Sequence, residues 1–197
     1  MWLIRAHEDR TGCYALKSEK VFSDKDIDYL NWYVENNLQL DNAKTGSAGE
    51  GRLTEYRKSN VAWLMPTDEN VRYYFETISK YVVSANDRYF NYSLTGFDSI
   101  QYTVYPETVN GKYDWHTDAG DLYTTENWMR KLSVVVALND DFDGGEFQTL
   151  SSDTPNTYKL NKGDMILFPS FLMHRVTPVT KGTRRSLVAW VSGPNFV

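Results

Sequence analysis

Residues 98–118, DSIQYTVYPETVNGKYDWHTD, contain the pattern that decides the fold class. Two short runs rich in β-branched and aromatic residues, 99–105 and 113–117, flank the turn signal Asn110-Gly111. Such runs are typical of short strands. The pattern continues downstream in five more runs, at 131–139, 146–150, 165–168, 174–179 and 186–191. Short strands at this even spacing predict a mainly β sandwich or barrel.

The N-terminal part of the chain has helical rather than strand periodicity. Ser23 is placed to cap a helix over 24–38, whose apolar residues recur on one face. A second amphipathic helix is expected to begin after Pro66, with Thr67 as its cap, and to continue to Tyr89. We therefore expect helices that support a β core from one side.

Composition limits the class of protein. A chain of 197 residues fits one domain. The net charge of −5 argues against a nucleic-acid partner, and no apolar run is long enough for a membrane span. The single cysteine, Cys13, excludes an intrachain disulfide and a cysteine-based zinc site. With no apolar signal segment at the N-terminus, a cytoplasmic protein is expected.

Two of the three histidines occur in the β region, where they suggest a metal site. His116 and Asp118 are two residues apart, so on one strand they would share a face, and His174 follows 56 residues later. Two imidazoles and one carboxylate form the facial triad of non-haem Fe(II) oxygenases. The triplet His-x-Asp alone is also compatible with a turn or capping role.

Ten residues after His174, Arg184 and Ser186 form an Arg-x-Ser pattern on one strand face. A guanidinium binds a carboxylate through two parallel hydrogen bonds, and a serine hydroxyl adds another donor. A dicarboxylate that chelates iron would need such an anchor. Arg185 points to the opposite face and is interpreted as a solvated charge.

The sequence resembles the Fe(II)/2-oxoglutarate-dependent dioxygenases, and among them the prolyl 4-hydroxylase-like branch with the PKHD-type hydroxylases. Arg57-Lys58-Ser59 resembles the upstream part of the family. The other matching motifs occur in family order: QYTVYP at 101–106, YDWHTD at 113–118, RKLS at 130–133, DGGEF at 143–147, KGDMILFPS at 162–170 and HRVTPVTKGTR at 174–184.

The resemblance implies a mainly β fold, a double-stranded β-helix of the jelly-roll or cupin-like type with flanking helices. It implies one dioxygenase domain over 1–197. Within it, 1–97 would form a helical support with a lid, and 98–197 the catalytic double-stranded β-helix. The long loop at 41–60 is our candidate for the lid.

The resemblance also assigns roles to site residues. Fe(II) would be bound by three catalytic residues, His116, Asp118 and His174. The co-substrate 2-oxoglutarate would meet Arg184 at its distal carboxylate, with Tyr105 and Ser186 as further cofactor-binding residues. O₂ is the oxidant, and ascorbate is an additional cofactor candidate. Trp190 would line the cleft floor, and Ala137 stands where animal prolyl hydroxylases carry a co-substrate tyrosine.

The implied activity is hydroxylation of a peptidyl residue, with proline as the favoured target, and release of succinate and CO₂. The partner would then be a peptide or protein. Three alternatives stay open: hydroxylation of a free amino acid or other small molecule, a non-catalytic jelly-roll binding module, and a cupin-like metal enzyme that does not use 2-oxoglutarate. The complete set of triad and Arg184 argues against the last two.

Overall fold

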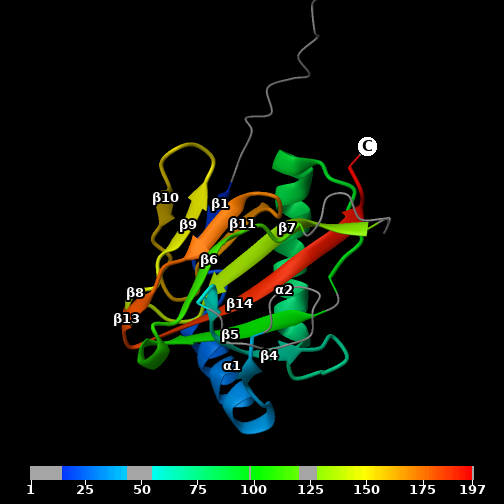
Figure 1. The fold of residues 1–197 in the computed structure, drawn as a ribbon. Coiled ribbons are helices and arrows are strands. Elements are labelled where there is room, and N and C mark those ends of the chain that lie inside the picture. The colour runs from blue at the N-terminus through cyan, green and yellow to red at the C-terminus, as the bar shows by residue number, and fades with distance from the viewer. Residues whose placement is uncertain (1–14, 44–54, 98, 120–127, 197) are drawn as a thin grey trace, which may run out of the picture.

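The computed structural model describes residues 15–43, 55–97, 99–119 and 128–196, which form two facing β-sheets with two helices (Figure 1). The large sheet has seven strands in the order β1-β11-β7-β14-β5-β4-β2. The small sheet has five strands in the order β10-β9-β12-β6-β3, and β13 pairs with β8 as a separate ribbon. All strand pairs in the described residues are antiparallel, so the described core is the expected mainly β fold of double-stranded β-helix type.

The large sheet is built from both halves of the chain. Its strands are β1 (Leu16–Ser18), β2 (Asp41–Asn42), β4 (Asn60–Leu64), β5 (Ile100–Pro106), β7 (Trp128–Ala137), β11 (Met165–Pro169) and β14 (Thr183–Pro194). The small sheet and the ribbon contain β3 (Arg57–Lys58), β6 (Lys112–His116), β9 (Phe147–Leu150), β10 (Asn156–Tyr158), β12 (Met173–Val176), β8 (Asp143–Gly144) and β13 (Val179–Lys181).

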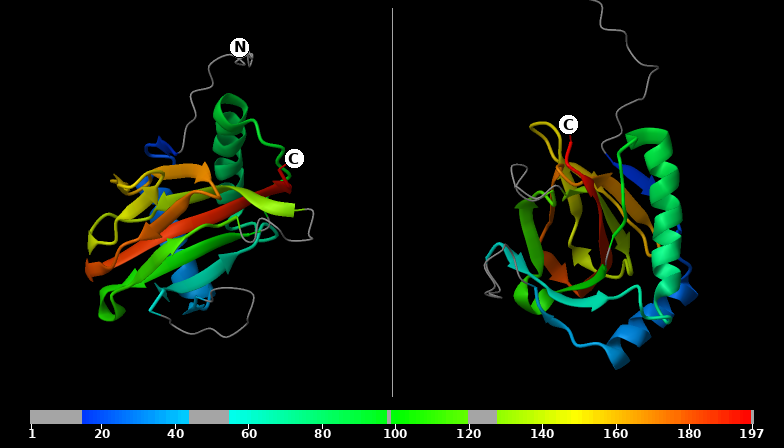
Figure 2. Two further views of the ribbon diagram at one scale, coloured as in Figure 1. Left: turned by 45° about the horizontal axis from the view of Figure 1, so that its top comes forward. Right: turned by 90° about the vertical axis from the view of Figure 1, so that its right-hand side faces the viewer.

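Both helices, α1 (Asp24–Asn37) and α2 (Arg72–Ala85), cover the outer face of the large sheet (Figure 2). Their apolar faces pack against every second residue of the central strands, and together these residues form the larger hydrophobic core. Leu132, Val134 and Val136 of β7 belong to this core. The outer face therefore supplies most of the apolar packing.

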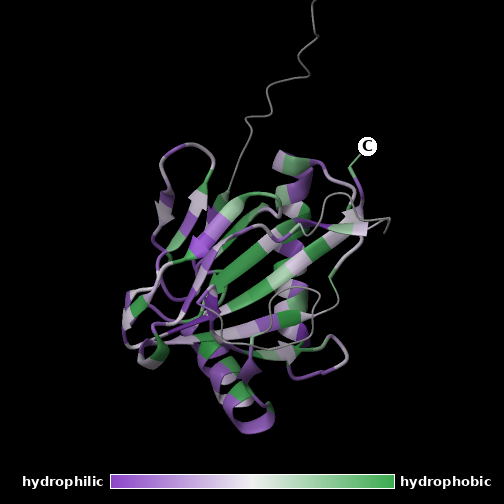
Figure 3. Cartoon of the chain, viewed as in Figure 1, coloured by the Kyte–Doolittle hydropathy of each residue, from purple (hydrophilic) through white to green (hydrophobic). Residues whose placement is uncertain are grey.

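The inner face of the large sheet, opposite the small sheet, has a different composition. It combines a smaller apolar cluster, which includes Val135 and Phe168, with buried polar residues such as Thr103 and Ser133. In Figure 3 the central strands β7 and β14 are largely hydrophobic, whereas the connections at the ends of the sheets are hydrophilic. The space between the two sheets is thus the part of the core that contains polar side chains.

Helix α1 confirms the prediction from its sequence. It begins at Asp24, and Ser23 caps it in a capping box with Asp26. Helix α2 begins later than predicted: Arg72 is its first residue, and Val71 precedes it without a side-chain cap, so Thr67 is not the cap. A π-helical segment, Asn86–Phe90, extends it to the neighbourhood of the predicted end. No helix among the described segments has the length and apolar character needed to cross a membrane.

The N-terminal half is more than a helical support, which corrects our expectation. Strands β1, β2 and β4 extend the large sheet on its two edges, and β3 extends the small one. The parts of the proposed lid that the structure describes, 41–43 and 55–60, include β2 and β3, and Arg57 of β3 is buried. Residues 44–54 of that loop, and His7 and Cys13, lie outside the described residues.

Candidate active site

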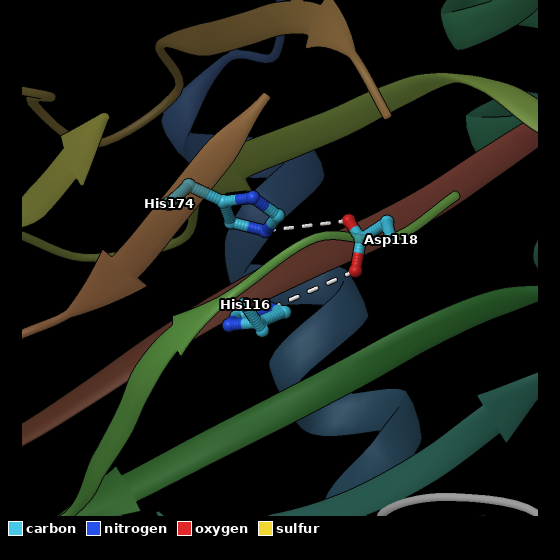
Figure 4. Close-up of side chains that lie close together, drawn as sticks. All are labelled: His116, Asp118 and His174. Atoms are coloured by element: carbon cyan, nitrogen blue, oxygen red, sulfur yellow. Dashed lines mark ion pairs between the residues drawn. The ribbon is translucent and has the colours of Figure 1, made fainter. Parts of the chain in front are cut away.

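The three residues of the predicted facial triad meet between the two sheets. His116 is the last residue of β6 and His174 belongs to β12, and these strands pair so that the two histidines are register partners. Asp118 lies beyond the end of β6, not on the strand as predicted, yet its carboxylate faces both imidazoles (Figure 4). Its oxygens lie 3.6 Å from Nε2 of His116 and 3.3 Å from Nε2 of His174. One ligand atom from each residue fits within 4.8 Å of the others.

Backbone carbonyls orient both imidazoles. Nδ1 of His116 lies 2.7 Å from the carbonyl oxygen of Asp114, and Nδ1 of His174 lies 2.9 Å from that of Leu172. A carbonyl only accepts hydrogen bonds, so each Nδ1 carries the proton and donates it. Each Nε2 is then left with its lone pair directed at the space beside Asp118, which is the arrangement of a metal-binding histidine.

Two buried serines hold Asp118 in place, and the sequence analysis missed the role of both. The Ser133 hydroxyl donates to Oδ2 of Asp118 at 2.8 Å and also lies 2.9 Å from Oγ of Ser170. The backbone N–H of Asp118 donates to the carbonyl oxygen of Ser170 at 2.8 Å. The position of Asp118 is therefore fixed through both its side chain and its backbone.

The electrostatics of the triad favour the protonation states that bind metal. Burial, followed by the neighbouring His174, lowers the pKa of His116 to about 4. Burial alone would raise the pKa of Asp118, but His174 and the hydrogen bond from Ser133 hold it below its usual range. Asp118 is thus an anion and His116 a neutral imidazole near pH 7. This donor set, two imidazole nitrogens and one carboxylate, fits Fe(II).

Arg184, Tyr105 and Ser186 come together as the sequence predicts. Arg184 is buried, and its Nη1 donates to Oγ of Ser186 at 3.0 Å. Its guanidinium lies over the ring of Tyr105, 5.2 Å from the centroid. Within the described part of the chain, no carboxylate forms an ion pair with Arg184. A buried guanidinium without a carboxylate partner is suited to bind the carboxylate of a ligand.

These residues line one cleft, which we call the inner cleft. Its walls include the triad, Arg184 and Trp190. Nε1 of Trp190 is buried and has no hydrogen-bond partner in the described structure. Arg185 points to the other face, with Nη2 4.0 Å from Glu35 of α1. The expectations for Trp190 and Arg185 therefore agree with the geometry, except that Arg185 lies near a carboxylate.

Arg57 also lines the inner cleft, although the sequence analysis gave it only a place in the family motif. Its Nε donates to Oγ of Ser59 at 3.0 Å and its Nη2 to Oε1 of Gln101 at 2.8 Å. The guanidinium lies 4.4 Å from the ring centroid of Tyr113, which in turn stacks on His116. The Arg-Lys-Ser motif was the only sequence signal that pointed to this residue.

Comparisons with known proteins agree with this geometry. The model of the 2OG-Fe(II) oxygenase superfamily matches residues 100–192. A PKHD-type hydroxylase of Synechococcus sp. (strain JA-2-3B'a(2-13)) is 38% identical over 82 residues, which cover 40% of this chain and 37% of that protein. The match thus spans less than half of this curated relative.

Two solved structures share the fold at low identity. A prolyl hydroxylase from Trichoplax adhaerens, in complex with a hypoxia inducible factor oxygen degradation domain peptide fragment, has a TM-score of 0.74. It is 18% identical, and the superposition covers 92% of this chain and 84% of that one. The viral collagen prolyl hydroxylase of Paramecium Bursaria Chlorella virus-1, as its 2OG complex, has a TM-score of 0.69 at 21% identity, with 93% and 98% covered.

Proposed function

We propose that this protein is an Fe(II)- and 2-oxoglutarate-dependent dioxygenase that hydroxylates a peptidyl residue, with proline as the favoured target. Its residues 100–192 match the 2OG-Fe(II) oxygenase superfamily. The single observation that carries the proposal is the inner cleft. It combines an oriented His-Asp-His triad with a buried arginine that has no carboxylate partner in the described structure.

In this proposal His116, Asp118 and His174 hold the metal, and Arg184 holds the distal carboxylate of 2-oxoglutarate. Fe(II), 2-oxoglutarate and O₂ together supply the oxidising power for C–H hydroxylation, with succinate and CO₂ as the other products. The residues of the chain bind and orient. The backbone carbonyls keep the imidazole protons on Nδ1, and Ser186 positions the guanidinium.

A peptide substrate is favoured by the relatives. The Trichoplax structure contains a peptide, and the viral neighbour is described as a collagen prolyl hydroxylase. Hydroxylation of a free amino acid or other small molecule is the alternative within the same chemistry. The non-catalytic module and the cupin-like enzyme without 2-oxoglutarate are disfavoured, because neither needs both the triad and Arg184 in one cleft.

The test measures succinate release from 2-oxoglutarate by protein loaded anaerobically with Fe(II) and then exposed to air. Wild type, Asp118→Ala and Arg184→Ala are compared, each with and without a pool of proline-rich peptides. We expect turnover in the wild type, its loss in both variants, and stimulation by the peptides with a mass gain of one oxygen. Absence of iron binding and of succinate in the wild type would refute the proposal.

Stimulation by small molecules, but not by peptides, would retain the dioxygenase and overturn the peptidyl substrate. Ascorbate is added in a separate arm, because its effect reports on recovery of the metal centre rather than on substrate choice. The cytoplasmic location and the absence of a nucleic-acid partner stay predictions from the sequence.

A further inference from the structure

A second cavity, which we call the outer cavity, borders Arg184 as the inner cleft does. It has a volume of about 280 Å³ and is lined by Ala137, the glycine pair 144–145 and residues 157–161, among others. Arg184 and Phe147 line both spaces. These two side chains therefore form a wall that the two spaces share. The lining of the outer cavity also includes Gly144 of β8, and the ribbon of β8 and β13 lies at one end of the sheets (Figure 1).

Two small residues, Ala137 and Gly145, line the outer cavity beside this wall. Ala137 ends β7 on the inner face, where it is the register partner of Ser186. Gly145 has a positive φ of 59°, and a Cβ there would lie only 3.1 Å from Cδ of Arg184. Position 145 is therefore packed closely against Arg184, and a larger residue there would press on the arginine side chain.

Arg184 is held by neutral neighbours. It donates a hydrogen bond to Ser186 and lies over the face of Tyr105, and no ion pair to a carboxylate of the described residues anchors it. The outer cavity, by contrast, is also lined by the acidic residues Asp140 and Glu146. A guanidinium displaced outward would therefore stay in a site with compensating negative charge.

The charges of the outer cavity argue against an independent anion site. Its basic residues, Lys159, Arg184 and Arg185, are offset by Asp140 and Glu146. The feature that the cavity adds to the site is space behind the co-substrate anchor. Its volume corresponds to roughly nine water molecules at about 30 Å³ each, far more than one added methylene requires.

We propose that the co-substrate site accepts 2-oxo dicarboxylates one methylene longer than 2-oxoglutarate, with 2-oxoadipate as the test compound, because Arg184 can shift into the outer cavity. This inference rests on the proposed function. The corresponding reaction is 2-oxoadipate + O₂ + substrate C–H → glutarate + CO₂ + substrate C–OH. Both electrons from decarboxylation and both from the substrate reduce O₂, as with 2-oxoglutarate.

The first experiment is a binding titration that needs no turnover. Mn(II)-loaded protein is titrated calorimetrically with 2-oxoglutarate and with 2-oxoadipate. A close-fitting pocket discriminates against one methylene by roughly 10–200-fold, so we expect a ratio of dissociation constants below about 10 in the wild type. Glutarate formation from 2-oxoadipate by the Fe(II) enzyme is the second readout.

Variants that fill the outer cavity from two sides provide the control. Ala137→Leu and, separately, Leu160→Phe are expected to raise the ratio of the two dissociation constants by about tenfold, whereas Ala137→Ser, which adds one atom, is expected to change it little. For each variant the dissociation constant of 2-oxoadipate is divided by that of 2-oxoglutarate, so a loss of affinity for both compounds cancels.

The outcomes separate this inference from the proposed function. Tight binding of 2-oxoglutarate with 2-oxoadipate weaker by more than about 100-fold in the wild type would overturn the inference and leave the dioxygenase intact. A wild-type ratio that neither filling variant changes would also overturn it, because the outer cavity would then not accommodate the shift. Binding of neither compound would refute both proposals.

Discussion

Ser133 is the residue whose loss tests how Asp118 is held. Its hydroxyl donates to Oδ2 of Asp118, and its relative exposure is 0%. Ser133→Ala removes this hydrogen bond and frees the carboxylate to rotate. Because outer hydrogen bonds to metal ligands contribute about 10–100-fold in affinity, we expect Mn(II) binding to weaken by that amount. Ser192→Ala, on β14, is the matched control, and an unchanged affinity in folded Ser133→Ala would contradict the prediction.

The depressed pKa of His116 predicts how the metal-free protein responds to acid. The folded-state pKa is about 4, below the ordinary value of 6.5, so the unfolded chain binds more protons between these values. The contribution of His116 to the free energy of unfolding should therefore be fully present above pH 6.5. It should be lost on acidification toward pH 4, by up to about 1.4 kcal/mol per pH unit. Urea unfolding in the presence of a chelator measures the slope.

His116→Gln is the comparison for this pH dependence, because glutamine does not titrate. The variant is expected to show a shallower loss of stability between pH 6.5 and 4 than the wild type. Equal slopes for the two proteins would mean that another group carries the acid sensitivity.

At the scale of residues, the sequence predicted the groups that a ligand would touch better than the groups that support them. His116, Asp118, His174 and Arg184 follow a spacing that chemistry makes recognisable. Ser133 and Ser170 were missed because their role arises only when β7 and β11 pair. The pairing brings the two hydroxyls together, so that Ser133 reaches the carboxylate of Asp118 and the carbonyl of Ser170 accepts its backbone N–H. A serine in a strand carries no such information by itself.

Among the elements, α1 offers a clean test of a local signal. Ser23 accepts the N–H of Asp26, and Asp26 accepts the N–H of Ser23 at 2.9 Å. Ser23→Ala removes this reciprocal pair, and we expect a loss of about 1 kcal/mol in the free energy of unfolding. Ser84→Ala, at an exposed position of α2, should stay within about 0.5 kcal/mol of the wild type. Similar losses in both would show that the cap does not contribute specifically.

The elements that were predicted correctly are those whose signals are local. The cap of α1 and most strands after residue 98 have periodicity and turn residues in their own sequence. The start of α2 was placed too early because Thr67 is a suitable cap residue by type, whereas the chain first makes turns and enters the helix at Arg72. Strands β1 and β3 are three and two residues long, and they exist because a partner strand is available.

In the whole molecule, alternate residues of the large sheet have different surroundings: one set faces the helix-covered core and the other faces the site. On β7, Val134 faces the helices in the larger core, whereas its neighbour Val135 lines the inner cleft. Both are buried, with relative exposures of 0% and 6%. Truncation of valine to alanine at these two adjacent positions therefore removes the same two methyl groups, but from opposite sides of one strand.

Val134→Ala and Val135→Ala make this separation measurable. Each should lower the free energy of unfolding, by about 1.5–3 kcal/mol for Val134, where helices and sheet leave little freedom to collapse. Only Val135→Ala should change the dissociation constant of 2-oxoglutarate on Mn(II)-loaded protein, because only that side chain borders the inner cleft. An equal change in affinity for both variants would mean that the helices and the site are coupled through the sheet. Affinity that moves with Val135 alone would instead mean that the helix-covered core can be altered without disturbing the site.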